Sequence, residues 1–362
     1  MDDAAQKAAC TRSLSAFAPH RRTPSRAIQR WASADTEAAI DGDVYGEGGV
    51  VAEVEQDVAA LLGKPAAVFM PTGTMAQQIA LRVHADARGS RTVVFHPLCH
   101  LECNEERAFE HLHGLVGRPA GAPDRLLTLA DLQQVDEPCS ALVLELPQRM
   151  IGAQLPSWAD LVAQCAWARD RGAAVHMDGA RLWETQPYYG RPYAEIAALF
   201  DTVYVSFYKG LGGLGGCALA GPVDVIDAAR IWRTRHGGLV FALWPYAADA
   251  RHGLAVEAPQ MAPRYEQART LAAELAGLPG FGVRPDPPQT PLFGLLIDQP
   301  AAAVQAARAR VAGSRGVWMF DRLWPGPPTR VEVTVGDQLV EFAPGEVAEL
   351  FALLRSFAAE AA

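Results

Sequence analysis

The chain has 362 residues, half of them apolar, which suits a globular protein with one large core and a second, smaller domain. Its net charge of −9 argues against nucleic acid or an anionic membrane as a partner. No apolar run approaches the roughly 18 residues that span a bilayer, and the first residues lack the apolar segment of a signal peptide. We therefore expect a cytoplasmic protein.

Six cysteines are too few for a disulfide scaffold in a chain of this size. The segment from Cys99 to Cys103 also contains His100, and this spacing is the only one that resembles a metal site. It lacks a matching second pair of ligands. We favour buried, reduced thiols over a structural zinc site and expect no bound metal.

Short strand-like runs alternate with longer helical patterns through the first two thirds of the chain. Before the first run, for example, apolar residues recur at helical spacing at Val54, Val58, Leu61 and Leu62. This alternation predicts an α/β fold with a mostly parallel sheet between helices. The predicted strands are Ala66–Met70, Arg91–Phe95, Ala141–Leu146, Ala173–Met177, Thr202–Phe207 and Cys217–Ala220.

The pattern changes after about residue 255, where an α+β arrangement begins. A Pro-rich stretch at 284–291 separates a helical segment near Tyr265–Ala276 from a strand at Leu292–Ile297. An Ala-rich helix, a strand pair and a last helix from Gly345 follow. We expect an N-terminal arm (1–30), a large domain that contains the parallel sheet (31–255) and a small α+β domain (256–362).

Only three lysines occur, and Lys209 is the one placed for chemistry. It closes the strand-like run that starts at Thr202 and precedes the Gly-rich segment 210–216. A desolvated lysine can lose its proton and form a Schiff base, whereas an arginine cannot. Lys7 lies in a polar N-terminal segment and Lys64 follows a helix-ending glycine, so both are poor candidates.

Two other predicted strand ends carry residues that could bind a charged group of a ligand. After Ala66–Met70, Gly73 and Thr74 open a helix whose free N–H groups suit a phosphate, although this is also an ordinary capped turn. After the fourth strand, Asp178 suits a protonated ring nitrogen and Arg181 a second anchor, with a helix-capping Asp as the alternative. Ligands collect at such strand ends. With Lys209, these features predict pyridoxal 5′-phosphate.

Four segments together match one known set of motifs: Asp43–Glu47, Thr72–Ala76, His176–Leu182 and Tyr208–Gly212. They resemble the threonine aldolase (β-eliminating lyase) family, which has the aspartate-aminotransferase fold, fold type I. The resemblance runs from about residue 40 to residue 335. It implies that Lys209 forms the Schiff base and that Asp178 pairs with the pyridine nitrogen.

The resemblance also implies contacts for other residues. Gly73, Thr74 and Arg233 would meet the phosphate, and His100 would stack on the cofactor ring or, alternatively, be a core histidine. Arg181 and Arg330 would steer the cofactor edge and the substrate carboxylate, although either could be a surface charge. Because the family forms dimers or tetramers, we expect a homodimer or homotetramer, in which Tyr45 reaches a neighbour's site or packs in its own loop.

Several departures from the family fall near the expected substrate. Gln148 stands where the family has a histidine close to the substrate β-hydroxyl, and a glutamine cannot take a proton. Gln77 replaces an asparagine, and Phe241-Ala242 replaces an Arg-Gln pair. The base for the β-hydroxyl is then His100, Glu105 or an ordered water.

The expected activity is that of a lyase. It would cleave the Cα–Cβ bond of a β-hydroxy-α-amino acid such as threonine, allo-threonine or phenylserine, giving glycine and an aldehyde. One alternative keeps the cofactor but catalyses β-elimination or racemisation. A second alternative is a catalytically silent relative, against which the presence of both Lys209 and Asp178 argues.

Overall fold

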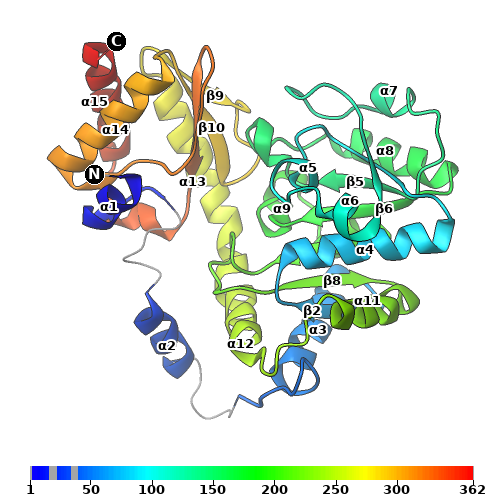
Figure 1. The fold of residues 1–362 in the computed structure, drawn as a ribbon. Coiled ribbons are helices and arrows are strands. Elements are labelled where there is room, and N and C mark those ends of the chain that lie inside the picture. The colour runs from blue at the N-terminus through cyan, green and yellow to red at the C-terminus, as the bar shows by residue number, and fades with distance from the viewer. Residues whose placement is uncertain (1, 16–22, 34–39, 362) are drawn as a thin grey trace. The chain divides into compact units, whose positions relative to one another are not determined.

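The computed structural model describes residues 2–15, 23–33 and 40–361. The chain divides into two compact units (Figure 1). The large unit comprises residues 31–151 and 155–260, and the small unit comprises residues 1–30, 152–154 and 261–362. Helix α2 (Pro24–Ser33) contains the first boundary between them.

A seven-stranded sheet forms the centre of the large unit, in the order β2-β8-β7-β6-β5-β3-β4. All neighbouring pairs are parallel except those of β8, which runs antiparallel to both β2 and β7. The prediction of an α/β fold on a mostly parallel sheet is confirmed. The strands are β2 (Ala66–Met70), β3 (Thr92–Phe95), β4 (Val116–Pro119), β5 (Ala141–Glu145), β6 (Ala174–Gly179), β7 (Thr202–Ser206) and β8 (Cys217–Gly221).

Helices cover this sheet, and their apolar residues form its core. Helices α4 and α11 pack together on β2, β7 and β8 through residues such as Met70, Ile79 and Ile226. The helices of the large unit are α3 (Gly49–Leu62), α4 (Gly73–Arg88), α5 (His100–Cys103), α6 (Ala108–His113), α7 (Leu129–Leu132), α8 (Trp158–Asp170), α9 (Gln186–Tyr189), α10 (Tyr193–Ala197), α11 (Val223–Arg235) and α12 (Trp244–His252). Single turns η1 (Arg149–Ile151), η2 (Leu182–Glu184), η3 (Gly253–Glu257) and η4 (Ala258–Gln260) complete it.

Strand β4 was not predicted from the sequence. Val116–Pro119 contains a glycine and a proline and is largely exposed, so no apolar run marks it. It lies at the edge of the sheet and pairs only with β3, which is where a strand with a proline is tolerated.

Strands β7 and β8 form an antiparallel hairpin, with Ser206 opposite Cys217. The loop between them contains Lys209. Gly216 at its end has φ of +79°, and a Cβ there would lie 2.3 Å from the ring of Phe69. Only glycine tolerates both the positive φ and the lack of space for a Cβ, which explains the glycine at position 216 of the Gly-rich segment.

The small unit has a four-stranded antiparallel sheet in the order β12-β13-β10-β9, with helices packed on it. Its N-terminal segment belongs to this unit, because β1 pairs with β11 and Leu14 lies in the apolar core. The elements are α1 (Asp3–Ala9), β1 (Arg12–Ser13), α13 (Met261–Ala276), β9 (Phe281–Arg284), β10 (Leu292–Ile297), α14 (Ala301–Arg315), β11 (Val317–Trp318), β12 (Leu323–Trp324), β13 (Thr329–Thr334), η5 (Asp337–Glu341) and α15 (Glu346–Ala361).

Within the described residues, no helix is long and apolar enough to cross a membrane. The same residues contain no cluster of three or more His, Cys, Asp or Glu side chains that could hold a metal ion. All six cysteines are free thiols, and five of them are buried.

Candidate active site

The candidate site lies at one edge of the large sheet. Strands β2, β3, β5, β6 and β7 all run in the same direction, so their carboxyl ends share that edge. Gly73, His100, Glu145, Asp178 and Lys209 each lie at or just beyond one of these ends. The sheet topology therefore gathers residues that are up to 136 positions apart in the chain.

Lys209 follows β7 and is half-buried. Burial lowers the pKa of its amine, while the charge of Asp178 acts in the opposite direction. Its Nζ has no hydrogen-bond or ion-pair partner among the residues that the structure describes. The other two lysines are engaged: Lys7 pairs with Asp321 at 2.6 Å, and the Nζ of Lys64 donates to the carbonyl oxygen of Phe200.

Asp178 is a buried residue of β6, with an exposed fraction of only 4%. Its Oδ1 accepts a hydrogen bond from the backbone N–H of Ala180 at 3.1 Å, and its Oδ2 accepts one from Nε2 of Gln77 at 2.5 Å. The turn that follows begins after Arg181, so Asp178 is not the N-cap of a helix. A buried carboxylate with acceptor capacity in this place suits a protonated ring nitrogen.

The turn before α4 is closely packed. Thr72 is the N-cap, accepting from the N–H of Met75 at 3.3 Å, and Gly73 and Thr74 form the first turn. A Cβ on Gly73 would lie 2.0 Å from the hydroxyl oxygen of Tyr204, so the backbone can lie here only without a side chain. The remaining N–H groups of this turn suit an anion.

Arg233, on α11, lies close to this turn. It is 2% exposed, and its Nη1 donates to the carbonyl oxygen of Phe69 at 2.9 Å, at the end of β2. Burial lowers the pKa of its guanidinium. Its Nε is buried without a partner in the described part of the chain. A buried cation with spare donor capacity beside a helix N-terminus fits a phosphate.

His100 begins α5, and its ring is fixed by Glu105. The His100 Nδ1 and the Glu105 Oε1 are 2.8 Å apart, and the Glu105 Oε2 accepts from Nε2 of Gln78 at 2.7 Å. Burial tends to lower the pKa of His100, but the hydrogen bond with Glu105 and the charge of Asp178 outweigh it and raise the pKa. Glu105 thus orients His100, whose Nε2 is left for other partners.

Glu145 was not selected as a site residue from the sequence. It ends β5 directly opposite Asp178 in the register of the sheet. Burial, with the nearby charge of Asp178, raises the pKa of Glu145 to about 7. Its Oε2 accepts from the N–H of His100 at 3.2 Å and from the amide of Gln148 at 3.3 Å. Its position at a strand end, beside the departure at Gln148, was the signal that could have identified it.

The amide of Gln148 is already engaged on its nitrogen side. It is 4% exposed and donates to the carbonyl oxygen of Leu98 at 3.1 Å as well as to Glu145. Only its Oε1 is left to meet a substrate. Gln148 therefore ties the loop before His100 to the end of β5.

The three remaining predicted residues differ in setting. Arg181 is buried and forms an ion pair with Glu184 at 2.6 Å. Tyr45 is exposed, with its ring 5.3 Å from that of Phe241 in an edge-to-face arrangement. Arg330 lies on β13 of the small unit, where its guanidinium stacks on Trp324 at 4.4 Å from the ring centroid.

Comparisons with known proteins identify the family of this chain. The sequence profile of a family described as beta-eliminating lyase matches residues 23–295. A structure from an Exiguobacterium species, provisionally assigned as an aromatic amino acid beta-eliminating lyase/threonine aldolase, is 38% identical over 98% of this chain and 99% of its own, with a TM-score of 0.90.

Two further relatives are similar. A structure from Listeria monocytogenes, provisionally assigned as an L-allo-threonine aldolase, is 35% identical over 98% of both chains, with a TM-score of 0.91. The low specificity L-threonine aldolase of Escherichia coli is 30% identical over 70% of this chain and 76% of its own length. The chain spans between 54% and 76% of the length of the curated relatives that it matches.

Proposed function

Because the chain belongs to the beta-eliminating lyase family, we propose that it cleaves the Cα–Cβ bond of a β-hydroxy-α-amino acid to glycine and an aldehyde. It is a lyase of fold type I, and its cofactor is pyridoxal 5′-phosphate. Threonine, allo-threonine and phenylserine are the proposed substrates. The relatives from Listeria and Escherichia coli support this choice, since both carry the name of threonine or allo-threonine aldolases.

The state of the three lysines is the observation that supports the proposal most strongly. Lys7 and Lys64 are both engaged, whereas Lys209 has a lowered pKa and lies within the electrostatic reach of Asp178. The unprotonated amine is the form that reacts with an aldehyde, and a lowered pKa increases its fraction at a given pH.

The residues present fit the cofactor. The first turn of α4 and the buried Arg233 would hold its phosphate, Asp178 its ring nitrogen, and Lys209 its aldehyde carbon. When bound, pyridoxal phosphate supplies a ring that accepts the electron pair left at Cα. Asp178 would keep the ring nitrogen protonated, because a buried carboxylate accepts that hydrogen bond strongly.

We propose that His100 accepts the proton of the substrate β-hydroxyl. Both oxygens of Glu105 have hydrogen-bond partners within the protein, one His100 and the other Gln78, so we assign Glu105 to orienting the imidazole. With Nδ1 directed to Glu105, the Nε2 lone pair of His100 can accept a proton, and the raised pKa makes it a stronger base. Gln148 would accept a substrate hydrogen bond through Oε1, and Arg181 and Arg330 would bind carboxylate or cofactor oxygen atoms.

We also propose a cytoplasmic homo-oligomer. Val44, Tyr45, Val240 and Phe241 are exposed apolar residues, and the ring contact between Tyr45 and Phe241 joins their two segments into one surface. A second copy of the chain would cover this surface. The six free thiols suit a reducing compartment.

Incubation of the purified protein and pyridoxal phosphate with threonine, allo-threonine or phenylserine tests the proposal. Release of glycine and aldehyde in equal amounts supports it. Pyruvate or another keto acid would identify β-elimination, and an inverted amino acid would identify racemisation. Failure to bind the cofactor at Lys209, tested by borohydride reduction and peptide mapping, would identify a silent relative.

A further inference from the structure

A row of hydrogen-bonded polar side chains begins at Asp178 and runs away from the candidate site; it is buried from Asp178 to His84 and ends at the exposed Arg88. Gln77 is its first member, with Nε2 2.5 Å from Oδ2 of Asp178 and Oε1 2.6 Å from Nε2 of His176. Gln77 is 1% exposed and His176 is completely buried. The two contacts make Gln77 a bridge between a carboxylate and an imidazole.

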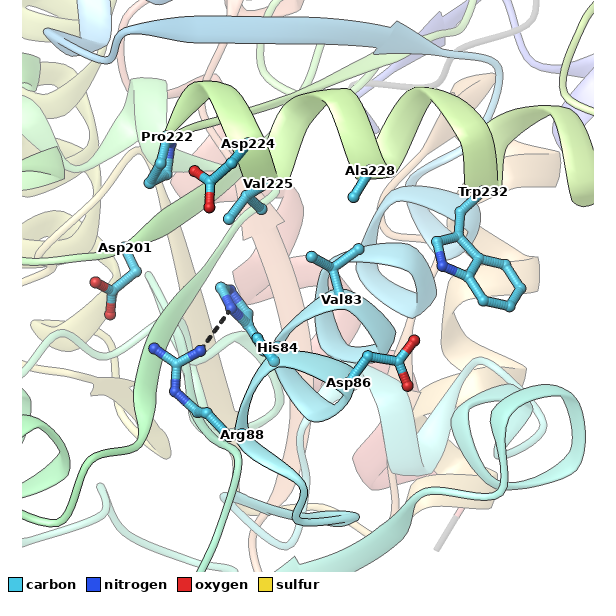
Figure 2. Close-up of a pocket in the computed structure, with 11 residues that line it drawn as sticks. Val83, His84, Asp86, Arg88, Asp201, Pro222, Asp224, Val225, Ala228 and Trp232 are labelled. Carbon is cyan, nitrogen blue, oxygen red and sulfur yellow. Dashed lines mark hydrogen bonds between the residues drawn. The ribbon is translucent and has the colours of Figure 1, made fainter.

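The row continues across the sheet to the far end of α4. The Oγ1 of Thr202 lies 2.8 Å from Nδ1 of His176 and 2.8 Å from Nε2 of His84. His84 Nδ1 is in turn 3.5 Å from Nη1 of Arg88. Figure 2 shows this outer end, where His84 and Arg88 face each other in the wall of a pocket.

One helix supplies half of this row. Gln77, His84 and Arg88 are seven and four positions apart on α4, so they lie along the same face of the helix. That face rests on β6 and β7, which supply His176, Asp178 and Thr202. The row thus depends on how α4 lies against the sheet.

The two ends of the row impose the same direction on every hydrogen bond. Arg88 can only donate, and an ionised Asp178 can only accept. Gln77 must therefore turn its NH₂ group toward Asp178, which leaves its oxygen to accept from Nε2–H of His176. The Nδ1 of His176 is then an acceptor for the hydroxyl of Thr202, and Thr202 accepts from Nε2–H of His84. Each group donates toward Asp178.

The burial of the two histidines agrees with this assignment. Burial lowers the pKa of both His84 and His176 to about 3, so both rings are neutral at ordinary pH and each carries one N–H. A neutral ring can donate at one nitrogen and accept at the other, as the row requires.

We propose that Gln77 and His176 are positioning residues for Asp178, which hold its carboxylate as an aligned acceptor for the cofactor ring nitrogen through hydrogen bonds that all donate toward it. This inference rests on the proposed role of Asp178. The aligned donors stabilise the negative charge of a carboxylate that is otherwise deprived of water. The bridge also explains the departure at Gln77, since its side chain contacts Asp178 and His176 at once.

The test uses Gln77→Met, which preserves length and removes both polar atoms. Gln338→Met is the matched control, because Gln338 is equally buried and donates to two carbonyl oxygens in the small unit. The dissociation constant for pyridoxal phosphate should rise about 10- to 100-fold in Gln77→Met and stay unchanged in Gln338→Met. Thr202→Val, which is nearly isosteric, should raise it by about two- to fivefold, and it serves if Gln77→Met does not fold.

A second readout needs no cofactor. In ¹⁵N NMR spectra of the cofactor-free protein, His176 should be a single Nε2–H tautomer, and Thr202→Val should shift the signal of its Nδ1. A protonated or Nδ1–H ring in the unaltered protein would overturn the direction of the hydrogen bonds. If Asp178→Asn weakens cofactor binding but Gln77→Met and Thr202→Val do not, the positioning role of Gln77 and His176 is refuted while the proposed role of Asp178 stands. If Asp178→Asn also leaves binding unchanged, the proposed role of Asp178 is refuted first, and this inference with it.

Discussion

Replacing His84 should change how the stability of the large unit depends on pH. Burial, helped by the charge of Arg88, lowers the pKa of His84 from 6.5 to about 3 in the folded protein. In the unfolded chain the ring titrates near 6.5. A histidine whose pKa is lowered by folding contributes stability above pH 6.5, and that contribution is lost as the pH falls from 6.5 toward 3, because only the unfolded chain binds the proton.

The size of this effect follows from the two pKa values. At pH 5 the ring lies about 1.5 pH units below its unfolded pKa, and each unit is worth about 1.36 kcal/mol, so the loss relative to pH 8 is about 2 kcal/mol. His176 has the same lowered pKa and should add a similar loss. The two histidines together should cost the cofactor-free protein about 4 kcal/mol of unfolding free energy between pH 8 and pH 5.

His84→Gln removes one of these groups and keeps a donor near Thr202. Urea unfolding of the cofactor-free protein at pH 8 and pH 5, followed by circular dichroism, gives the free energy of unfolding for each protein. The packing cost of the substitution is present at both pH values and cancels in the difference. The variant should lose about 2 kcal/mol less than the unaltered protein over this range. An equal loss in both would mean that His84 binds a proton inside the folded unit, and the reasoning would fail.

Three further substitutions probe the site. Lys209→Ala should abolish the visible absorbance of the bound cofactor and nearly all turnover while circular dichroism stays unchanged; borohydride labelling of another lysine would contradict this. Asp178→Asn should retain some cofactor but lose about 3–5 kcal/mol of transition-state stabilisation in kcat/KM, since it breaks a buried charged contact, and normal turnover would leave Asp178 a structural residue. Gly73→Ala should destabilise the protein by about 1–3 kcal/mol and weaken cofactor binding, because its Cβ would meet the hydroxyl of Tyr204 at 2.0 Å; unchanged melting and affinity would show that the turn can shift.

The sequence predicted what depends on local pattern. The strands at Ala66–Met70 and Leu292–Ile297 have the predicted bounds, and the other five predicted ranges differ by one or two residues at their ends, because apolar runs flanked by turns mark buried strands clearly. The edge strand Val116–Pro119 carried no such pattern. The motif residues at strand ends could likewise be selected, since a carboxylate or a lysine after an apolar run is conspicuous.

Hydrogen bonds between residues far apart in the chain could not be predicted from the sequence. In the sequence, Gln148 stood out because a glutamine cannot accept a proton as the family histidine can. In the structure, its side-chain nitrogen donates hydrogen bonds to the carbonyl oxygen of Leu98 and to Glu145. The contact of Gln77 with His176 joins residues 99 positions apart. Such pairs depend on the order of the strands and on the rotation of α4 about its axis, and neither is encoded in a local pattern.

The β7–β8 hairpin has a consequence for the order in which the site assembles. Parallel neighbours such as β5 and β6 meet only after a long crossover has closed, whereas Ser206 and Cys217 are eleven positions apart. Closing a short loop costs less chain entropy and is faster. The segment that carries Lys209 should thus gain protection from hydrogen exchange early in refolding, before β5 and β6 pair and bring Glu145 and Asp178 side by side.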